Sequence, residues 1–133
     1  MGSATAVLRP FDHYMRYRLI NGLLQLGRDR EAGKLLRVCQ GDAGADWLYS
    51  WALWAFRTEG DSRGSRRRLT EAMVHNPYVP AYLRRLRRLP RHPPHLVGLG
   101  DKDEAVSYAA AAKVIWQETP GALDWLAHIQ QAL

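Results

Sequence analysis

Residues 48–77 read LYSWALWAFRTEGDSRGSRRRLTEAMVHNP, and this stretch decides the predicted fold. Its first half carries apolar and aromatic residues on nearly every helical face, which is typical of a helix buried between neighbours. Gly60 then ends that helix, and Asp61 or Ser62 is placed to cap a second, amphipathic helix that stops before Pro77. The stretch therefore predicts two antiparallel helices joined by a tight turn.

The flanking sequence repeats this helix-and-turn pattern without strand-like alternation. Before the pair, Asp12 and Asp29 are expected to cap the first two helices, and Asp46 to cap the third. After the pair, three more helices are expected, at about 80–89, 103–118 and 120–133. Seven helices with mostly short connections predict an all-α protein built from antiparallel helix pairs.

Length and composition favour one domain spanning residues 1–133, because 133 residues with 47% apolar content can form a core without disulfides or metals. The single cysteine, Cys39, cannot form an internal disulfide, which favours a reducing, cytoplasmic setting. The opening residues do not form a signal peptide, and no apolar stretch is long enough to cross a bilayer. No membrane role is expected.

A repeat is visible in the spacing of the bends. Gly27 and Gly60 lie 33 residues apart, close to the period of roughly 34 residues in tetratricopeptide repeats. The second unit resembles that family most clearly, with aromatic, small and turn residues at the expected places: Tyr49, Phe56, Gly60, Ser65, Ala72 and Pro77. The resemblance implies a short right-handed solenoid with units at about 12–45, 46–79 and 80–118 and a capping helix at 120–133. About six extra residues would fall in the proline-rich loop before Gly100.

Residues 76–126 carry a second resemblance. The run NPYVPAYL is followed in order by a basic stretch, PPH, GDKDEAVSYA and TPGALDWL. This order is similar to the C-terminal region of suppressor-of-tumorigenicity-type proteins and their bacterial relatives. The resemblance implies helical-repeat architecture and partner binding without a defined catalytic activity.

The net charge of +6 is concentrated in one segment. Residues 63–92 hold nine arginines and one carboxylate, Glu71, which leaves a net +8. Helical spacing predicts two basic faces in this segment, followed by a further arginine in the loop: Arg63, Arg66 and Arg67; Arg84, Arg87 and Arg88; and Arg91. Arginine binds both carboxylates and phosphates, so the segment suits an acidic protein or a nucleic-acid backbone. The alternative is a solvated face compensated by carboxylates near residues 101–104.

The tetratricopeptide resemblance also implies a concave groove lined by the first helix of each pair. It places four further candidates there: Tyr17, Asn21, Trp54 and Arg57. An aromatic, amide- and arginine-rich groove suits an extended acidic segment. Trp47, Trp51 and Trp54 form one helical stripe, which is interpreted as core packing, with ligand contact by Trp54 as the alternative.

The sequence lacks recognisable catalytic, phosphate-binding and metal-binding motifs. The sequence has no nucleophile with a spaced base, no phosphate-binding glycine motif, and no histidine or cysteine at metal-ligand spacing, so no enzyme activity, cofactor or metal is expected. The predicted function is a non-catalytic scaffold or adaptor that binds an acidic protein segment. RNA or DNA binding through Arg63–Arg91 and self-association through Trp47 or the last helix are the alternatives.

Overall fold

The computed structural model describes residues 10–92 and 98–133, with side chains described from Tyr14 onward within these ranges. Seven helices and no strand occur in this part of the chain, which confirms the predicted all-α class. The helices are α1 (Pro10–Gln25), α2 (Asp29–Val38), α3 (Ala45–Glu59), α4 (Arg63–His75), α5 (Val79–Leu83), α6 (Lys102–Glu118) and α7 (Ala122–Ala132).

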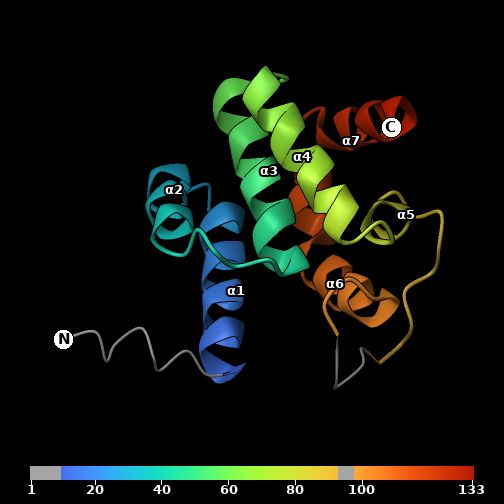
Figure 1. Cartoon of the computed structure of the whole chain (residues 1–133), viewed down its shortest axis with the longest axis horizontal. Helices are drawn as coiled ribbons and strands as arrows, with labels where there is room; N and C mark the ends of the chain where they lie inside the picture. The colour runs from blue at the N-terminus through green and yellow to red at the C-terminus, as the bar shows by residue number, and fades with distance from the viewer. Residues whose placement is uncertain (1–9, 93–97) are drawn as a thin grey trace.

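Helix α3 is the centre of the fold. It packs against α1, α2, α4 and α6, and Figure 1 shows it between the α1–α2 pair and α4. Trp47, Tyr49 and Leu53 have no exposed surface, and Trp51 is also buried. The predicted core role of Trp47 and Trp51 is confirmed. The suggestion that Trp47 contacts another copy is wrong, because no part of its side chain reaches the surface.

The turn between α3 and α4 follows the predicted pattern. Gly60 has φ +69° and ψ −154°, a conformation that residues with a Cβ rarely adopt. Ser62 caps α4 and forms a reciprocal capping box with Ser65, which occupies the third helical position. Of the two predicted caps, Asp61 or Ser62, Ser62 is the one that opens this helix.

Three aspartates predicted as helix caps lie inside their helices. α1 begins at Pro10, before Asp12; α2 begins at Asp29 itself; and α3 begins at Ala45, before Asp46. The residues at the cap positions of α2 and α3 form no side-chain cap hydrogen bond. Acidic residues are favoured throughout the first turn by the positive end of the helix dipole, so their presence does not distinguish the cap from the turn.

The first turn of α3 is instead completed by a distant residue. The backbone N–H of Ala45 donates to Oε2 of Glu104, in α6, at 3.0 Å. These two residues are 59 positions apart in the chain, so no local capping pattern could reveal the contact.

Helix α5 is shorter than predicted. The expected helix to Leu89 is wrong, because α5 ends at Leu83 and Arg85 has φ +62°. The N–H of Leu86 donates to the carbonyl of Ala81 at 2.8 Å, and the N–H of Arg85 donates to that of Tyr82 at 3.2 Å. This is the Schellman pattern that ends a helix. Continuing the helix would have stacked four arginines within about two turns, which like-charge repulsion disfavours.

The last two helices complete the core. α6 packs against α1, α3, α5 and α7, and α7 also packs against α4 and α5. Trp116 and Tyr108 of α6 are fully buried, and the Trp116 indole donates to the Tyr108 hydroxyl at 2.9 Å. Part of the predicted proline-rich loop, residues 93–97, lies outside the described residues.

Candidate protein-binding surface

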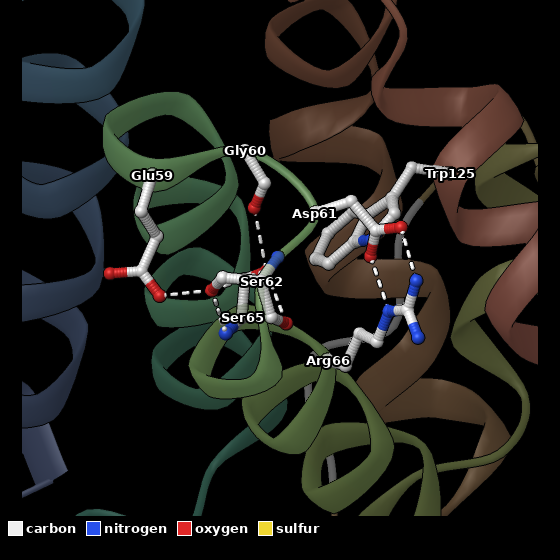
Figure 2. Close-up of polar contacts among 7 residues, drawn as sticks. All are labelled: Glu59, Gly60, Asp61, Ser62, Ser65, Arg66 and Trp125. Carbon is white, nitrogen blue, oxygen red and sulfur yellow. Dashed lines mark hydrogen bonds and ion pairs between the residues drawn. The ribbon is translucent and has the colours of Figure 1, made fainter.

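Asp61, in the turn before α4, links the start of α4 to α7 (Figure 2). Its carboxylate accepts hydrogen bonds from Nε and Nη2 of Arg66 at 2.6 and 2.7 Å, and from Nε1 of Trp125 at 2.9 Å. The hydrogen bond from Arg66 is the main reason that the pKa of Asp61 falls to about 2. Arg66 therefore has its carboxylate partner within the chain.

Ser62 and Ser65 fix the direction in which α4 leaves the turn. The Ser65 N–H donates to Ser62 Oγ at 3.0 Å, and the Ser62 N–H donates to Ser65 Oγ at 2.8 Å. The Ser65 hydroxyl also donates to the Gly60 carbonyl at 2.7 Å, as Figure 2 shows. The Ser62 hydroxyl donates to Glu59. These contacts set the orientation of the arginines on α4.

Arg63 and Arg67 are exposed on α4, one helical turn apart. Among the described residues, no carboxylate forms an ion pair with either of them. The predicted common face of Arg63, Arg66 and Arg67 thus contains one compensated arginine and two uncompensated ones.

Arg68 is a surface residue that the sequence patterns did not single out. Its guanidinium carbon lies 3.7 Å from the ring centroid of Trp51, on the preceding helix. Burial against α3 lowers the pKa of Arg68, and the contact has the geometry of a cation–π interaction. The contact between Arg68 and Trp51 could have been predicted, because the two residues lie at similar distances along the chain on either side of Gly60, the bend of an antiparallel helix pair.

The second basic cluster follows α5. Arg84 donates to Oε1 of Gln130, in α7, at 2.8 Å, and is partly buried. Arg87, Arg88 and Arg91 are exposed, and none of them has an ion-pair partner within the described residues. The predicted shared face of Arg84, Arg87 and Arg88 is wrong, because α5 has already ended at Leu83.

Helix α7 connects the two clusters. Arg66 reaches it through Asp61 and Trp125, and Arg84 reaches it at Gln130. Trp125 and Gln130 are five residues apart, or about 8 Å along the helix axis. Figure 1 shows α7 beside α4 and above α5. We define the arginine surface as the predicted site arginines that are exposed and have no ion-pair partner among the described residues: Arg63, Arg67, Arg87, Arg88 and Arg91.

The aromatic candidates of the predicted groove make contacts inside the domain. The Tyr17 hydroxyl donates to Asp42 Oδ1 at 2.8 Å, and its ring lies 6.1 Å from that of Trp47. The Trp54 indole N–H donates to the carbonyl of Asp29 at 2.7 Å. Both side chains are partly buried and tie α3 or the loop before it to the α1–α2 pair.

The polar candidates of the groove are also engaged. Asn21 accepts a hydrogen bond from the Ser50 hydroxyl at 3.5 Å. Arg57 forms an ion pair with Asp29 at 2.7 Å and donates to the carbonyl of Leu24 at 2.9 Å. The structure therefore places Tyr17, Asn21, Trp54 and Arg57 along the interface of α3 with α1 and α2.

A buried polar network is the largest feature that the sequence patterns missed. Glu104 is 5% exposed and accepts hydrogen bonds from the Ala45 N–H, the Asn76 side chain and the Gly100 N–H at 3.0, 2.7 and 2.8 Å. The backbone carbonyl of Asn76 in turn accepts a hydrogen bond from the Tyr49 hydroxyl at 2.6 Å. The network ties the start of α3 and the end of α4 to α6.

Asp46 lies beside this network. Burial, and then the negative charge of Glu104, raises the pKa of Asp46 to about 7. Two surface pockets, of about 410 and 380 Å³, are lined by neither Asp46 nor Glu104. The two carboxylates therefore do not line these pockets, and the hydrogen bonds of Glu104 serve to join helices.

Two further properties concern the described part of the chain. No group of three or more His, Cys, Asp or Glu side chains there is arranged to hold a metal ion. In the same residues, no helix combines the length and apolar character needed to cross a membrane.

Comparisons with protein-family models, with curated proteins and with solved structures found no match for this chain. The arginine surface is therefore interpreted from its own geometry and charge.

Proposed function

We propose that this protein is a non-catalytic, cytoplasmic scaffold or adaptor, built from tetratricopeptide-like helix pairs, that binds an acidic protein segment. The observation that carries the proposal is the arginine surface: five exposed guanidinium groups without an ion-pair partner among the described residues. Guanidinium groups bind carboxylates through paired, charge-assisted hydrogen bonds. An acidic segment would supply the partners that the fold does not.

The proposed contact includes exposed arginines of α4 and of the segment after α5, and both of these parts of the chain contact α7. Arg66 and Arg84 are already bound to Asp61 and Gln130, so we assign them the role of holding the surface in place. Tyr17, Asn21, Trp54 and Arg57 make internal contacts, and the proposal does not require them to touch the partner. The proposed binding site is therefore the arginine surface and not the predicted groove.

Binding of a fluorescent peptide of ten glutamates tests this proposal. The double charge reversal Arg63→Glu/Arg67→Glu should weaken binding at least about tenfold at 0.15 M salt, because two charge-assisted contacts are lost and replaced by repulsion. The matched control is Arg30→Glu/Lys34→Glu, which makes the same charge change on exposed positions of α2. Equal losses in both double variants would mean that net charge alone attracts the peptide, and the proposal would be wrong.

Phosphate-backbone binding is the second candidate, because the same arginines suit phosphate oxygens. A labelled 20-nucleotide RNA distinguishes the two. Under this candidate, RNA binds more tightly than the glutamate peptide, and its affinity falls steeply and log-linearly with salt. Absence of RNA binding at 50 mM salt would exclude it and leave the acidic-segment proposal standing.

A further inference from the structure

Helix α1 has two apolar faces, and the domain uses only one of them. Ile20 and Leu24 are buried against the neighbouring helices. On the opposite side, Met15, Leu19 and Leu26 are 59%, 52% and 74% exposed. Figure 1 shows α1 at the edge of the domain. Three large apolar side chains on one exposed helical face are more than the scattered single residues of an ordinary surface.

The exposed residues follow the spacing of a helix-pairing seam. Met15, Leu19, Gly22 and Leu26 are separated by four, three and four residues, as the apolar positions of a heptad are. The Leu26 N–H donates to the Gly22 carbonyl at 3.0 Å, so the helical hydrogen bonding includes the last of the four. We call these four residues the α1 seam.

Gly22 makes the α1 seam uneven. A Cβ at position 22 would meet nothing within 4 Å, so the position is open to solvent and leaves a notch between Leu19 and Leu26. Nothing inside the domain requires a glycine there. A notch in an apolar seam is useful where another helix must approach closely.

We propose that the α1 seam binds the same seam of a second copy of this chain, as an antiparallel pair about a two-fold axis. Placing the axis midway between Leu19 and Gly22 sets each Leu19 into the notch above Gly22 of the other copy. The same axis sets Met15 opposite Leu26. Each large residue therefore meets its complement on an identical helix, which an isologous contact requires.

Charge is compatible with this arrangement. In the same antiparallel register Arg18 flanks the seam next to Gln25 of the second copy, so no two arginines are brought into opposition. Arg18 is also held along its own helix, since it donates to the Tyr14 hydroxyl at 3.2 Å. The seam itself carries no charged residue.

The size of the contact sets the expected strength. The α1 seam spans about three turns of one helix, which buries less than the roughly 800 Å² per partner of a typical stable complex. The pair should therefore be weak, with a dissociation constant on the order of 100 µM.

Sedimentation equilibrium is the first test. Wild-type protein should change from monomer to mostly dimer between about 10 µM and 1 mM. Leu19→Arg should stay monomeric over this range while keeping the wild-type circular dichroism spectrum, because Leu19 is exposed in the monomer. Val74→Arg is the matched control, since Val74 is 73% exposed on α4, and should dimerise like the wild type. A wild-type monomer at 1 mM would overturn the proposal.

Disulfide trapping tests the geometry, on a Cys39→Ser background. Met15→Cys and Leu26→Cys chains should form mixed disulfide dimers when oxidised together. Each variant alone should not, because identical positions lie about 16 Å apart along antiparallel helices. Efficient Met15→Cys dimers alone would indicate a parallel pair. The absence of any mixed dimer at 1 mM protein would contradict the two-fold arrangement.

Discussion

Gly33 of α2 lies so close to the indole ring of Trp54 in α3 that a Cβ at position 33 would be 2.6 Å from Cζ2 of Trp54. The same indole is anchored by its N–H, which donates to the carbonyl of Asp29 at 2.7 Å. Arg37 covers the ring from α2, 5.3 Å from its centroid. Trp54 therefore cannot move aside easily, and the packing of α2 on α3 depends on the absence of a side chain at position 33.

The substitution Gly33→Ala should destabilise the protein by about 1–3 kcal/mol, because the new methyl group overpacks the interface with Trp54. Gly22→Ala is the matched control. It makes the same change inside a helix where nothing lies within 4 Å, and it should stabilise the monomer by about 0.5–1 kcal/mol through helix propensity. Urea unfolding at 10 µM protein measures both. If both variants were stabilised, the close packing of Gly33 on Trp54 would be disproved.

The substitution Arg85→Gly should stabilise the protein by roughly 1 kcal/mol. Arg85 has φ +62°, where a Cβ is strained and glycine is not. Arg87→Gly removes the same charge two residues later, at a position without a positive φ, and should be neutral or destabilising. Thermal unfolding of the two variants in parallel separates the backbone effect from the charge effect. Equal shifts would assign the change to charge alone.

The pKa of Asp46 gives stability a specific dependence on pH. Because the folded pKa is raised from 3.8 to about 7, the folded chain holds this proton more tightly than the unfolded chain. The stability that Asp46 contributes is fully present below about pH 4 and is lost as the pH rises through about 7. Asp46→Asn should therefore be more stable than the wild type at pH 8, by up to about 4 kcal/mol.

The measurement is the difference in unfolding free energy between Asp46→Asn and the wild type at pH 4, 6 and 8. Taking the difference cancels the contribution of groups that do not interact with Asp46. The charged groups that face Asp46 are Glu104 from α6 and Asp42 from the preceding loop, and the hydroxyls of Tyr17 and Tyr108 also lie near it. Asp103→Asn, at an exposed carboxylate, should show no such trend. A difference that does not change with pH would show that Asp46 is not the titrating group.

Loss of the Glu104 carboxylate should be costly. Glu104→Ala leaves three donors without an acceptor, from Ala45, Asn76 and Gly100. Since each unsatisfied buried donor costs about 1–3 kcal/mol and some will be reached by water, we expect a total loss of about 2–4 kcal/mol. Glu104→Gln keeps one acceptor oxygen and should lose less. Chemical denaturation at pH 7 compares them, and a Glu104→Ala variant as stable as the wild type would contradict the network.

The parts of the fold that depend on neighbours in sequence were predictable. The bend at Gly60 and the cap at Ser62 follow from residues within one helical turn, and both are present. The end of α5 was not predicted, because Leu83, Leu86 and Leu89 have helical spacing. The structure leaves Leu86 64% exposed, so the apolar spacing there does not correspond to a buried face.

In the candidate site, too, the sequence predicted helix faces but not the contacts between residues that are distant in the chain. Helical spacing located the arginines of α4 on an exposed surface, but it could not tell that Arg66 is paired with Asp61 while Arg63 and Arg67 are not. For Trp54 and Arg57, the sequence defined a helix face but not the helix that covers it. That depends on how α2 packs, through contacts with Asp29 that span 25 and 28 residues.

The hydrogen bond from Ala45 to Glu104 also bears on how the chain folds as it is synthesised. In an open array of repeats each unit contacts only its neighbours, and folding can start in any unit and spread. Here the start of α3 stays incomplete until a residue 59 positions later has emerged and α6 has docked. The start of α3 therefore gains this hydrogen bond only after α6 has been synthesised and has docked, so the α3–α4 pair should be less stable in a chain that ends before α6 than in the chain described here.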